Sequence, residues 1–380
     1  MNPLKILEIC PYSAGGCGVW QRVKQESLEL SKLGHEVLVF SSNIEKGTNK
    51  IISSNEEFEK IRIKRFPAKK LGGESFLFWN FEKQATEFKP DIIICHVYRH
   101  LHTLTSLSAI KKIRKNKKCK LILVTHAPFV EGNYTRSFFS KLIVRFYDFF
   151  VGPMTINKFD KVVAITKWEL PYLKKIKLRK RNLVYIPNGI PEEFFERKVQ
   201  QGKNILFLGR ISPIKNLETI IRAVPKLKNP KIIFDLIGPF EEEYKKKLDY
   251  LIKQLKIEKQ VNFLGPIYDL KKKIQMIDKY NFFVLSSRRE AMPQALIEAM
   301  ARGKIVFASK TQGGKEIIQD NENGFLFRIG DSDELANLIN NLENKNLKNI
   351  SENAISTSKN FQWKNLIRDL EKLFYYTSSS

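Results

Sequence analysis

The sequence predicts an α/β protein of two domains, each with a doubly wound parallel sheet, and three observations predict it. Its 380 residues exceed what one hydrophobic core usually organises, so two domains of about 150 to 200 residues are expected. Short continuous apolar runs, of the kind that parallel sheets bury, alternate with segments of helical spacing. The alternation starts again after the turn-forming Pro187-Asn188-Gly189, which places the domain boundary near Asn188.

The elements of the first half follow one another as strand, loop and helix. Residues 4–10 are a short strand candidate, residues 11–18 a glycine-rich loop, and residues 19–33 a helix that ends at Gly34. Three further strands are expected in this half, at residues 36–41, 91–95 and 120–125. The second half repeats the rhythm, with strands at residues 204–208, 232–237, 261–264, 282–285 and 305–308.

The composition is that of a globular protein without an export signal or a disulfide framework. Hydrophobic residues make up 43% of the chain, which is enough apolar surface for packed cores and argues against disorder. The four cysteines show no CxxC spacing, so neither a zinc site nor disulfides are indicated, and a reducing cytoplasm is the expected compartment. The apolar run at the start is too short for a signal peptide or a membrane span, so we expect neither there.

Positive charge is concentrated in one part of the chain. The formal net charge is +26, and residues 101–181 carry 19 Lys and Arg against 4 Asp and Glu, a net charge of +15. A basic face of that size would attract nucleic acid, anionic lipid or a phosphorylated ligand, but a solvated helix surface has the same composition. No recognisable nucleic-acid-binding module accompanies the charge, so nucleic acid is not an expected partner.

Each half offers a loop at the end of a strand that suits an anion. In the first half, Gly15 and Gly16 let a phosphate approach backbone N–H groups, although a turn without a ligand fits the pattern equally well. In the second half, Gly209 and Arg210 end a strand and Lys215 starts the next helix. An Arg that binds phosphate oxygens in pairs and a Lys that adds a point charge suit a pyrophosphate, although such residues are more often surface charges.

Two carboxylates flank the helix start that follows the strand at residues 282–285. Glu290 lies in the loop and Glu298 about two turns along, where a spacing of eight directs Glu298 back toward the helix N-terminus. Both side chains could meet one elongated ligand. Because carboxylates accept hydrogen bonds in pairs, Glu298 suits the vicinal hydroxyls of a ribose and Glu290 those of a hexose.

Taken jointly and in order, these pieces resemble the large family 4 of retaining glycosyltransferases, whose fold is called GT-B, and the resemblance runs nearly end to end. The pieces are Gly15-Gly16, Gly34-His35-Glu36-Val37, Thr125-His126, Pro187-Asn188-Gly189-Ile190, Gly209-Arg210 with Lys215, and residues 290–298. The resemblance implies two Rossmann-like domains that face each other across a cleft. It implies an acceptor-side domain at residues 1–188, joined by a returning helix at 361–380, and a nucleotide-sugar-binding domain at residues 189–360.

The resemblance also implies roles in donor binding. Gly16 would contact the donor phosphates, and Arg210 and Lys215 would hold the diphosphate. Glu298 would bind the ribose, and backbone near Ile267 would hold the base. The other donor-binding residues implied are Gly15, Gly209, Met292, Pro293, Gln294 and Ala295.

The residues implied in catalysis are His126, Arg210, Lys215 and Glu290. Glu290 would meet the transferred sugar and His126 would reach it from the first domain, whereas a lone histidine is otherwise more often a cap or core residue. Ala291 stands where many members carry a glycine or small polar residue, which leaves the preference for donor hydroxyls open. The histidines at 96, 100 and 102 have no carboxylate or cysteine in register, so no metal is assigned, and no cofactor is expected beyond the nucleotide sugar.

The implied reaction is metal-independent transfer of a hexose-type sugar from a UDP- or GDP-sugar to an acceptor hydroxyl, with retention. The acceptor would attack on the face that the diphosphate leaves, and an oxygen of the diphosphate would take the proton. Positioning, cations and helix dipoles would supply the rate. Two alternatives stay open, an epimerase of GT-B fold and a non-catalytic nucleotide-sugar-binding protein, although the intact donor-site residues argue against the second.

The prediction of where the acceptor docks depends on residues 138–150, FFSKLIVRFYDFF. Their spacing places Lys141, Arg145 and Asp148 on one face of a helix. A helix packed on its own domain and a membrane-surface helix both produce this pattern. With the neighbouring positive charge, we expect a peripheral enzyme at the cytoplasmic membrane face. Its first domain would sit on anionic lipid and its acceptor would be a lipid-linked or cell-surface glycan precursor.

Overall fold

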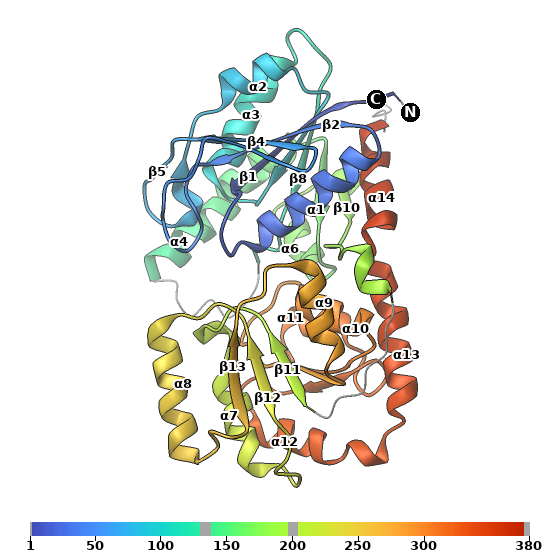
Figure 1. Cartoon of the computed structure of the whole chain (residues 1–380). Coiled ribbons are helices and arrows are strands. Elements are labelled where there is room, and N and C mark those ends of the chain that lie inside the picture. Colours follow the sequence, from blue (N-terminus) through green and yellow to red (C-terminus); the bar gives the residue numbers. More distant parts are fainter. Residues whose placement is uncertain (1, 130–137, 197–203, 376–380) are drawn as a thin grey trace. The chain divides into compact units, whose positions relative to one another are not determined.

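The computed structural model describes residues 2–129, 138–196 and 204–375, and the chain divides into two compact units (Figure 1). Unit 1 takes in the described residues 2–129, 138–189 and 363–375, and unit 2 the described residues 190–196 and 204–362. The chain passes between the units after residues 189 and 362. The resemblance places these crossings after residues 188 and 360.

Unit 1 is built on a sheet of eight strands in the order β10-β9-β8-β7-β1-β2-β4-β3. In chain order these strands are β1 (Lys5–Tyr12), β2 (Glu36–Ser42), β3 (Asn55–Phe58), β4 (Ile61–Phe66), β7 (Ile92–His96), β8 (Lys120–Val124), β9 (Lys161–Ala164) and β10 (Leu183–Tyr185). Its helices are α1 (Gly18–Lys32), α2 (Glu82–Phe88), α3 (Leu101–Ile113), α4 (Phe138–Phe146), α5 (Gly152–Ile156), α6 (Leu170–Lys175) and α14 (Trp363–Tyr375). A two-stranded ribbon joins β5 (Lys69–Lys70) and β6 (Leu77–Phe78).

The centre of this sheet is β1, which is buried from Ile6 to its end and has Glu8 as the one charged residue in this buried part. Ile6 pairs in parallel with Val37 of β2 on one side and with Ile92 of β7 on the other. The returning helix α14 packs on α1 through a buried stripe that starts at Trp363. Helix α14 therefore belongs to unit 1.

Unit 2 is built on six parallel strands in the order β13-β12-β11-β14-β15-β16. They are β11 (Ile205–Leu208), β12 (Phe234–Ile237), β13 (Val261–Gly265), β14 (Phe282–Leu285), β15 (Ile305–Ser309) and β16 (Phe325–Phe327). The helices are α7 (Leu217–Ala223), α8 (Glu242–Leu255), α9 (Leu270–Asp278), α10 (Gln294–Ala301), α11 (Gln312–Ile317), α12 (Ser332–Asn340) and α13 (Leu347–Ser358). Apart from the edge strand β13, these strands are mainly apolar and buried, as expected for a parallel sheet flanked by helices.

The predicted α/β class with parallel sheets is confirmed, with one departure. β3 runs antiparallel to β4 at the edge of the first sheet, where a tight hairpin joins them. The strands β3, β4, β9, β10 and β16 were not among the predicted elements. Four of them are short or part polar, so their sequences carry a weak periodic signal.

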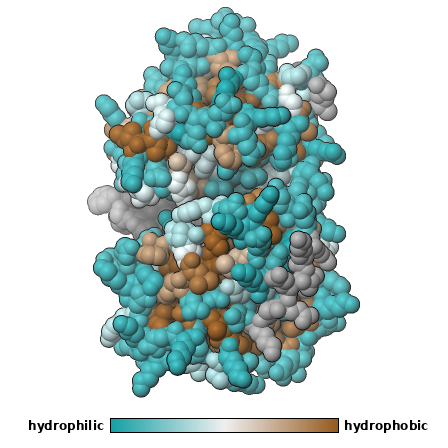
Figure 2. Space-filling view, in the orientation of Figure 1, coloured by the Kyte–Doolittle hydropathy of each residue, from teal (hydrophilic) through white to brown (hydrophobic). Residues whose placement is uncertain are grey.

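The surface of the molecule is mainly hydrophilic on the face that Figure 2 shows, as expected when the apolar side chains fill two cores. Within the part of the chain that the structure describes, no helix is both long enough and apolar enough to cross a membrane. All four cysteines are buried and free.

Candidate active site

In unit 2, the loops after β11 and β14 open at the same edge of the sheet. β11 lies between β12 and β14, so the strand order reverses on its two sides. Ligands of open parallel sheets bind at such a reversal, outside the carboxyl ends of the strands, because neighbouring loops diverge there. Six predicted residues lie in these two loops: Gly209, Arg210, Lys215, Glu290, Met292 and Pro293.

The loop after β11 depends on a close approach of two backbones. Gly238, which follows β12, has a φ of 151°, and a Cβ on it would lie 1.9 Å from the carbonyl oxygen of Gly209. No side chain fits there. Arg210 comes next, is exposed, and forms no ion pair with any residue in the described ranges. Its guanidinium is therefore accessible to an anion at this edge.

The two loops are joined by an ion pair between two predicted residues. Lys215 Nζ lies 2.5 Å from Glu290 Oε1, and the Ser287 hydroxyl donates to the same oxygen at 2.6 Å. The Ser286 hydroxyl donates to the Lys215 carbonyl at 2.8 Å, and the Arg288 N–H donates to the Ile214 carbonyl at the same distance. These contacts hold the lysine and the carboxylate together at the reversal point.

Glu298 lies one turn into α10, which begins at Gln294, rather than about two turns along as the spacing predicts. Its side chain is 9% exposed, and its Oε2 lies 2.5 Å from Nζ of Lys273 on α9. Sequence reasoning missed Lys273, because it lies in a run of three lysines that reads as a solvated helix face.

The segment before α10 is held by backbone contacts. Gly313 of α11 donates its N–H to the Glu290 carbonyl at 3.1 Å, and a Cβ on Gly313 would lie 2.5 Å from the Ala291 carbonyl oxygen. Met292, Gln294 and Ala295 are half-buried and Pro293 is buried at this helix start. Ile267, half-buried after β13, lies at the same edge of the sheet.

Gly15 and Gly16 follow β1 and belong to unit 1. Gly15 has a φ of 80°, and a Cβ on it would lie 2.2 Å from the Lys46 carbonyl oxygen, so the loop requires glycine there. At Gly16 a Cβ would meet no atom within 4 Å. The fold of the loop therefore explains Gly15 but not Gly16.

His126 follows β8 in unit 1, at the edge of the sheet where Gly15 and Gly16 also lie. It is half-buried, and both it and Ala127 have left-handed backbone, with φ of 58° and 48°. Two successive non-glycine residues in this region are strained, and such strain gathers at functional sites. Burial and the neighbouring His96 lower the pKa of His126 well below its ordinary value, so the ring is neutral at physiological pH.

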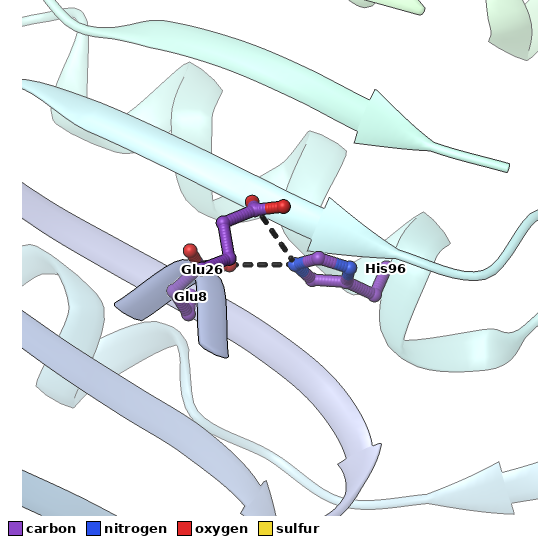
Figure 3. Close-up of side chains that lie close together, drawn as sticks. All are labelled: Glu8, Glu26 and His96. Carbon is purple, nitrogen blue, oxygen red and sulfur yellow. Dashed lines mark hydrogen bonds and ion pairs between the residues drawn. The ribbon is translucent and has the colours of Figure 1, made fainter. Parts of the chain in front are cut away.

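Behind His126 lies a buried polar cluster that sequence reasoning missed. His96 Nδ1 lies 2.9 Å from His126 Nε2. His96 Nε2 lies 2.6 Å from Glu8 Oε2, and Figure 3 shows this second contact. Glu26 of α1 approaches the same nitrogen at 4.0 Å and accepts from Arg22 at 2.8 Å. Spacing along the chain hides this cluster, because its members lie on β1, α1 and β7.

Burial dominates the electrostatics of this cluster. It raises the pKa of Glu8 to about 8 and that of Glu26 to about 7, and lowers the pKa of His96 to about 4. The expectation that none of the three histidines has a carboxylate beside it is wrong for His96, because Glu8 and Glu26 both lie next to its ring. His102 donates to the His96 carbonyl at 2.7 Å and has a structural role.

Comparisons with known proteins identify the family to which the chain belongs. The family model described as Glycosyl transferases group 1 matches residues 190–360, and the one described as Glycosyltransferase Family 4 matches residues 17–194. The chain belongs to the GT-B glycosyltransferases of this type. The first match takes in the loops after β11 and β14, and the second takes in His126. The predicted family and enzyme class are confirmed.

Relatives and solved structures agree with this family. This glycosyltransferase is 28% identical over 367 residues to an uncharacterized glycosyltransferase of Methanocaldococcus jannaschii, with 90% of each chain covered. It is also 28% identical over 186 residues to a Campylobacter jejuni N-acetyl-D-galactosaminyltransferase whose name gives an undecaprenol-linked glycan, covering 47% of this chain and 50% of the relative. Anabaena HepE, solved in complex with UDP and glucose, superimposes with a TM-score of 0.74 at 20% identity, covering 97% and 98% of the two chains. The predicted GT-B fold of two Rossmann-like domains is confirmed.

Proposed function

We propose that this glycosyltransferase moves a hexose-type sugar from a UDP- or GDP-sugar to an acceptor hydroxyl, with retention of the anomeric configuration. The observation that carries the proposal is the Lys215–Glu290 ion pair in the loops that also hold the accessible Arg210. A guanidinium and a lysine suit two phosphates, and a carboxylate beside them suits the hydroxyls of the attached sugar. The UDP and glucose named for the HepE structure support a donor of this class.

Donor binding would use contacts that already exist in unit 2. Lys215 would share its charge between Glu290 and the diphosphate, which keeps the carboxylate oriented toward the sugar. Lys273 would hold Glu298 through Oε2 and leave Oε1 for the ribose hydroxyls. Each carboxylate would thus be oriented by a lysine before the donor arrives, and preorganised groups lose little entropy on binding.

The chemistry would rest on charge and position. When the bond between the anomeric carbon and the diphosphate oxygen breaks, Arg210 and Lys215 would stabilise the negative charge on the leaving group. The acceptor hydroxyl would bond to the same carbon on the same face and pass its proton to a diphosphate oxygen. Because two cations neutralise the leaving group, we propose that no metal ion or other cofactor takes part.

A thermal-shift panel of UDP, GDP, ADP and their sugars tests the donor site. Ligand at about 100 times its dissociation constant adds roughly 2.7 kcal/mol of stability. We expect one base to be preferred and the shift to disappear in Arg210→Ala and Glu298→Ala. No shift with any nucleotide in the intact chain would refute the donor site.

Product analysis separates transfer from epimerisation. With donor alone, an epimerase of GT-B fold converts one nucleotide sugar to another, whereas a transferase consumes it only when acceptor is present. We expect no conversion without acceptor, and an α-linked product from an α-linked donor by NMR. An inverted product would contradict retention.

We also propose that the acceptor is lipid-linked and that unit 1 binds an anionic membrane surface at the cytoplasmic face. Six large apolar side chains on α4, on α5 and in the segment between them are exposed, and we call them the α4–α5 patch: Leu142, Ile143, Phe146, Phe149, Phe150 and Met154. Phe149 is 73% exposed, so an interpretation in which this segment packs on its own domain does not account for it. Lys141 and Arg145 are exposed beside these side chains, as expected for a surface that meets anionic lipid.

One detail of the patch differs from the expected single helix. α4 ends at Phe146 and a π-helical segment, η2 (Tyr147–Val151), follows it. Asp148 accepts from Arg99 Nε at 2.7 Å, which ties it to the loop after β7. The acidic residue is thereby neutralised, and the basic residues of α4 face solvent without it. The segment at residues 130–137 lies outside the described residues.

A further inference from the structure

The buried cluster of unit 1 forms a chain of hydrogen bonds that ends at His126. Glu8, Glu26, His96 and Arg22 are all wholly buried, whereas His126 is half-buried. The series of hydrogen bonds runs from Glu8 Oε2 to His96 Nε2 at 2.6 Å, and from His96 Nδ1 to His126 Nε2 at 2.9 Å. His126 Nδ1 forms no hydrogen bond within the described part of the chain. One ring nitrogen of His126 is therefore held from behind and the other is unused.

The protons in the hydrogen bonds from Glu8 through His96 to His126 can be arranged in only two ways. A neutral imidazole carries one N–H and one lone pair. If His96 donates to Glu8, its Nδ1 must accept from His126 Nε2–H, and His126 Nδ1 is left as an acceptor. If Glu8 donates to His96 instead, every bond reverses and His126 Nδ1 becomes a donor.

The rest of the cluster selects the first arrangement. Arg22 Nε donates to Glu26 Oε2 at 2.8 Å, which keeps a negative charge on Glu26. Oε1 of Glu8 and Oε1 of Glu26 are both buried without a hydrogen-bond partner, and one oxygen of each carboxyl group lies within 4.8 Å of the other. One proton on Glu8 Oε1, shared with Glu26 Oε1, satisfies both atoms. Glu8 Oε2 is then an acceptor, and the cluster is neutral, since Arg22 and Glu26 balance.

The pKa directions agree with this assignment. Burial raises the pKa of both Glu8 and Glu26, but only Glu26 accepts a hydrogen bond from Arg22, which lowers its pKa and favours Glu8 as the group that holds the shared proton. A divalent cation among Glu8, Glu26 and His96 would instead stand beside the guanidinium of Arg22, which already neutralises Glu26.

We propose that Glu8, Glu26 and His96 are positioning residues that fix His126 in the tautomer protonated on Nε2, so that its Nδ1 accepts a hydrogen bond from a hydroxyl of the bound sugar. The part of this proposal that concerns the sugar rests on the proposed function. The tautomer itself depends only on contacts inside unit 1.

Glu8→Gln and Glu8→Leu form a matched pair that tests the proposal. A glutamine accepts from His96 through its amide oxygen and donates to Glu26 through its amide nitrogen, so it reproduces the proposed protonation state of Glu8. A leucine of similar volume removes the acceptor. His96 then carries its proton on Nδ1, donates to His126, and forces the His126 proton onto Nδ1.

The readout is the tautomer of His126 in the full chain labelled with ¹⁵N-histidine, since protonated and bare ring nitrogens differ strongly in chemical shift. The chain has five histidines, and His126→Asn assigns the signal. We expect Nε2–H in the unmodified chain and in Glu8→Gln, and Nδ1–H in Glu8→Leu. Glu371→Gln, which alters the carboxyl 3.1 Å from Nε2 of His35, is the control and leaves the His126 signal unchanged.

A proton on Nδ1 of His126 in the unmodified chain would overturn the proposal, and this result needs no variant to fold. Equal tautomers in Glu8→Gln and Glu8→Leu would overturn it as well, as would a metal ion bound stoichiometrically and lost in Glu8→Gln. In binding assays, Glu8→Leu should weaken the nucleotide sugar about tenfold while the free nucleoside diphosphate binds unchanged. If the His126 tautomer responds to the Glu8 variants as expected but no nucleotide sugar binds, the positioning of His126 would stand and the proposed function would be refuted.

Discussion

Lys215 Nζ and Glu290 Oε1 lie 2.5 Å apart, although the two residues are 75 positions apart in the chain and belong to different loops. The pair is partly buried, so it keeps each partner in one place without sealing either from a ligand. A cation that suits a phosphate and an acceptor that suits sugar hydroxyls are thus held beside each other.

Lys215→Ala should lower kcat about 100-fold, because it removes charge stabilisation of the departing diphosphate at the moment it forms. Initial rates with saturating donor measure this. Lys310→Ala is the control, since it breaks the half-buried Lys310–Glu334 ion pair, which includes neither Lys215 nor Glu290, and should leave kcat unchanged. Equal effects of the two substitutions would contradict a role for Lys215 in the reaction.

Glu298→Ala should remove the preference for a ribonucleotide over its 2′-deoxy form. The carboxylate of Glu298 is the proposed acceptor for the ribose hydroxyls, and its loss should cost the ribonucleotide about tenfold in affinity and the deoxynucleotide little. Calorimetry with both nucleoside diphosphates measures the two values. Lys273→Ala should reduce the same preference to a smaller extent, because Lys273 only orients Glu298. A preference that survives in Glu298→Ala would place the ribose elsewhere.

Gly238→Ala should destabilise unit 2 by about 3 kcal/mol, because its Cβ would lie 1.9 Å from the Gly209 carbonyl and neither backbone can yield without moving a strand end. Thermal unfolding measures this. Gly73→Ala is the matched control: Gly73 has a φ of −68° and open space around it, so its change should be small. A neutral Gly238→Ala would show that the loop after β11 is free to rearrange.

Glu8 should make the folded state less stable as pH rises from about 4.5 to about 8. Its folded pKa is raised to about 8, so over this range the folded chain holds a proton that the unfolded chain has released, and stability falls with pH. Glu8→Gln should flatten the slope by at most about 1.4 kcal/mol per pH unit. Unfolding midpoints at several pH values compare it with Glu371→Gln. A slope unchanged in Glu8→Gln would mean that Glu8 is ionised when folded.

A triple substitution, Phe146→Ser with Phe149→Ser and Phe150→Ser, should reduce binding to vesicles of anionic phospholipid at least about tenfold, since each removes exposed apolar area. Stability should change little because these side chains face solvent. Tyr268→Ser is the control, because Tyr268 is 84% exposed but belongs to unit 2. Absence of binding by the intact chain at low salt would refute the membrane surface.

The buried central strands and the loops after β11 and β14 could be predicted from the sequence for a simple reason. Buried parallel strands such as β11 and β14 are continuous apolar runs, and the residues that follow them necessarily lie at the edge of the sheet. The positions of Arg210 and Glu290 follow from that rule. The hairpin of β3 and β4 did not follow from it, because an edge strand with charged residues has no apolar run to detect.

The sequence by itself determined the fold class, the family and the loops that hold Gly209, Lys215 and Glu290, since these depend on local pattern and order along the chain. Only the tertiary structure decided which side chains meet. Glu298 pairs with Lys273, and Glu8 meets His96 across 88 residues, because parallel sheets join strands that are distant in the chain. The exposure of the α4–α5 patch was decided in the same way, since an amphipathic pattern does not show which face is covered.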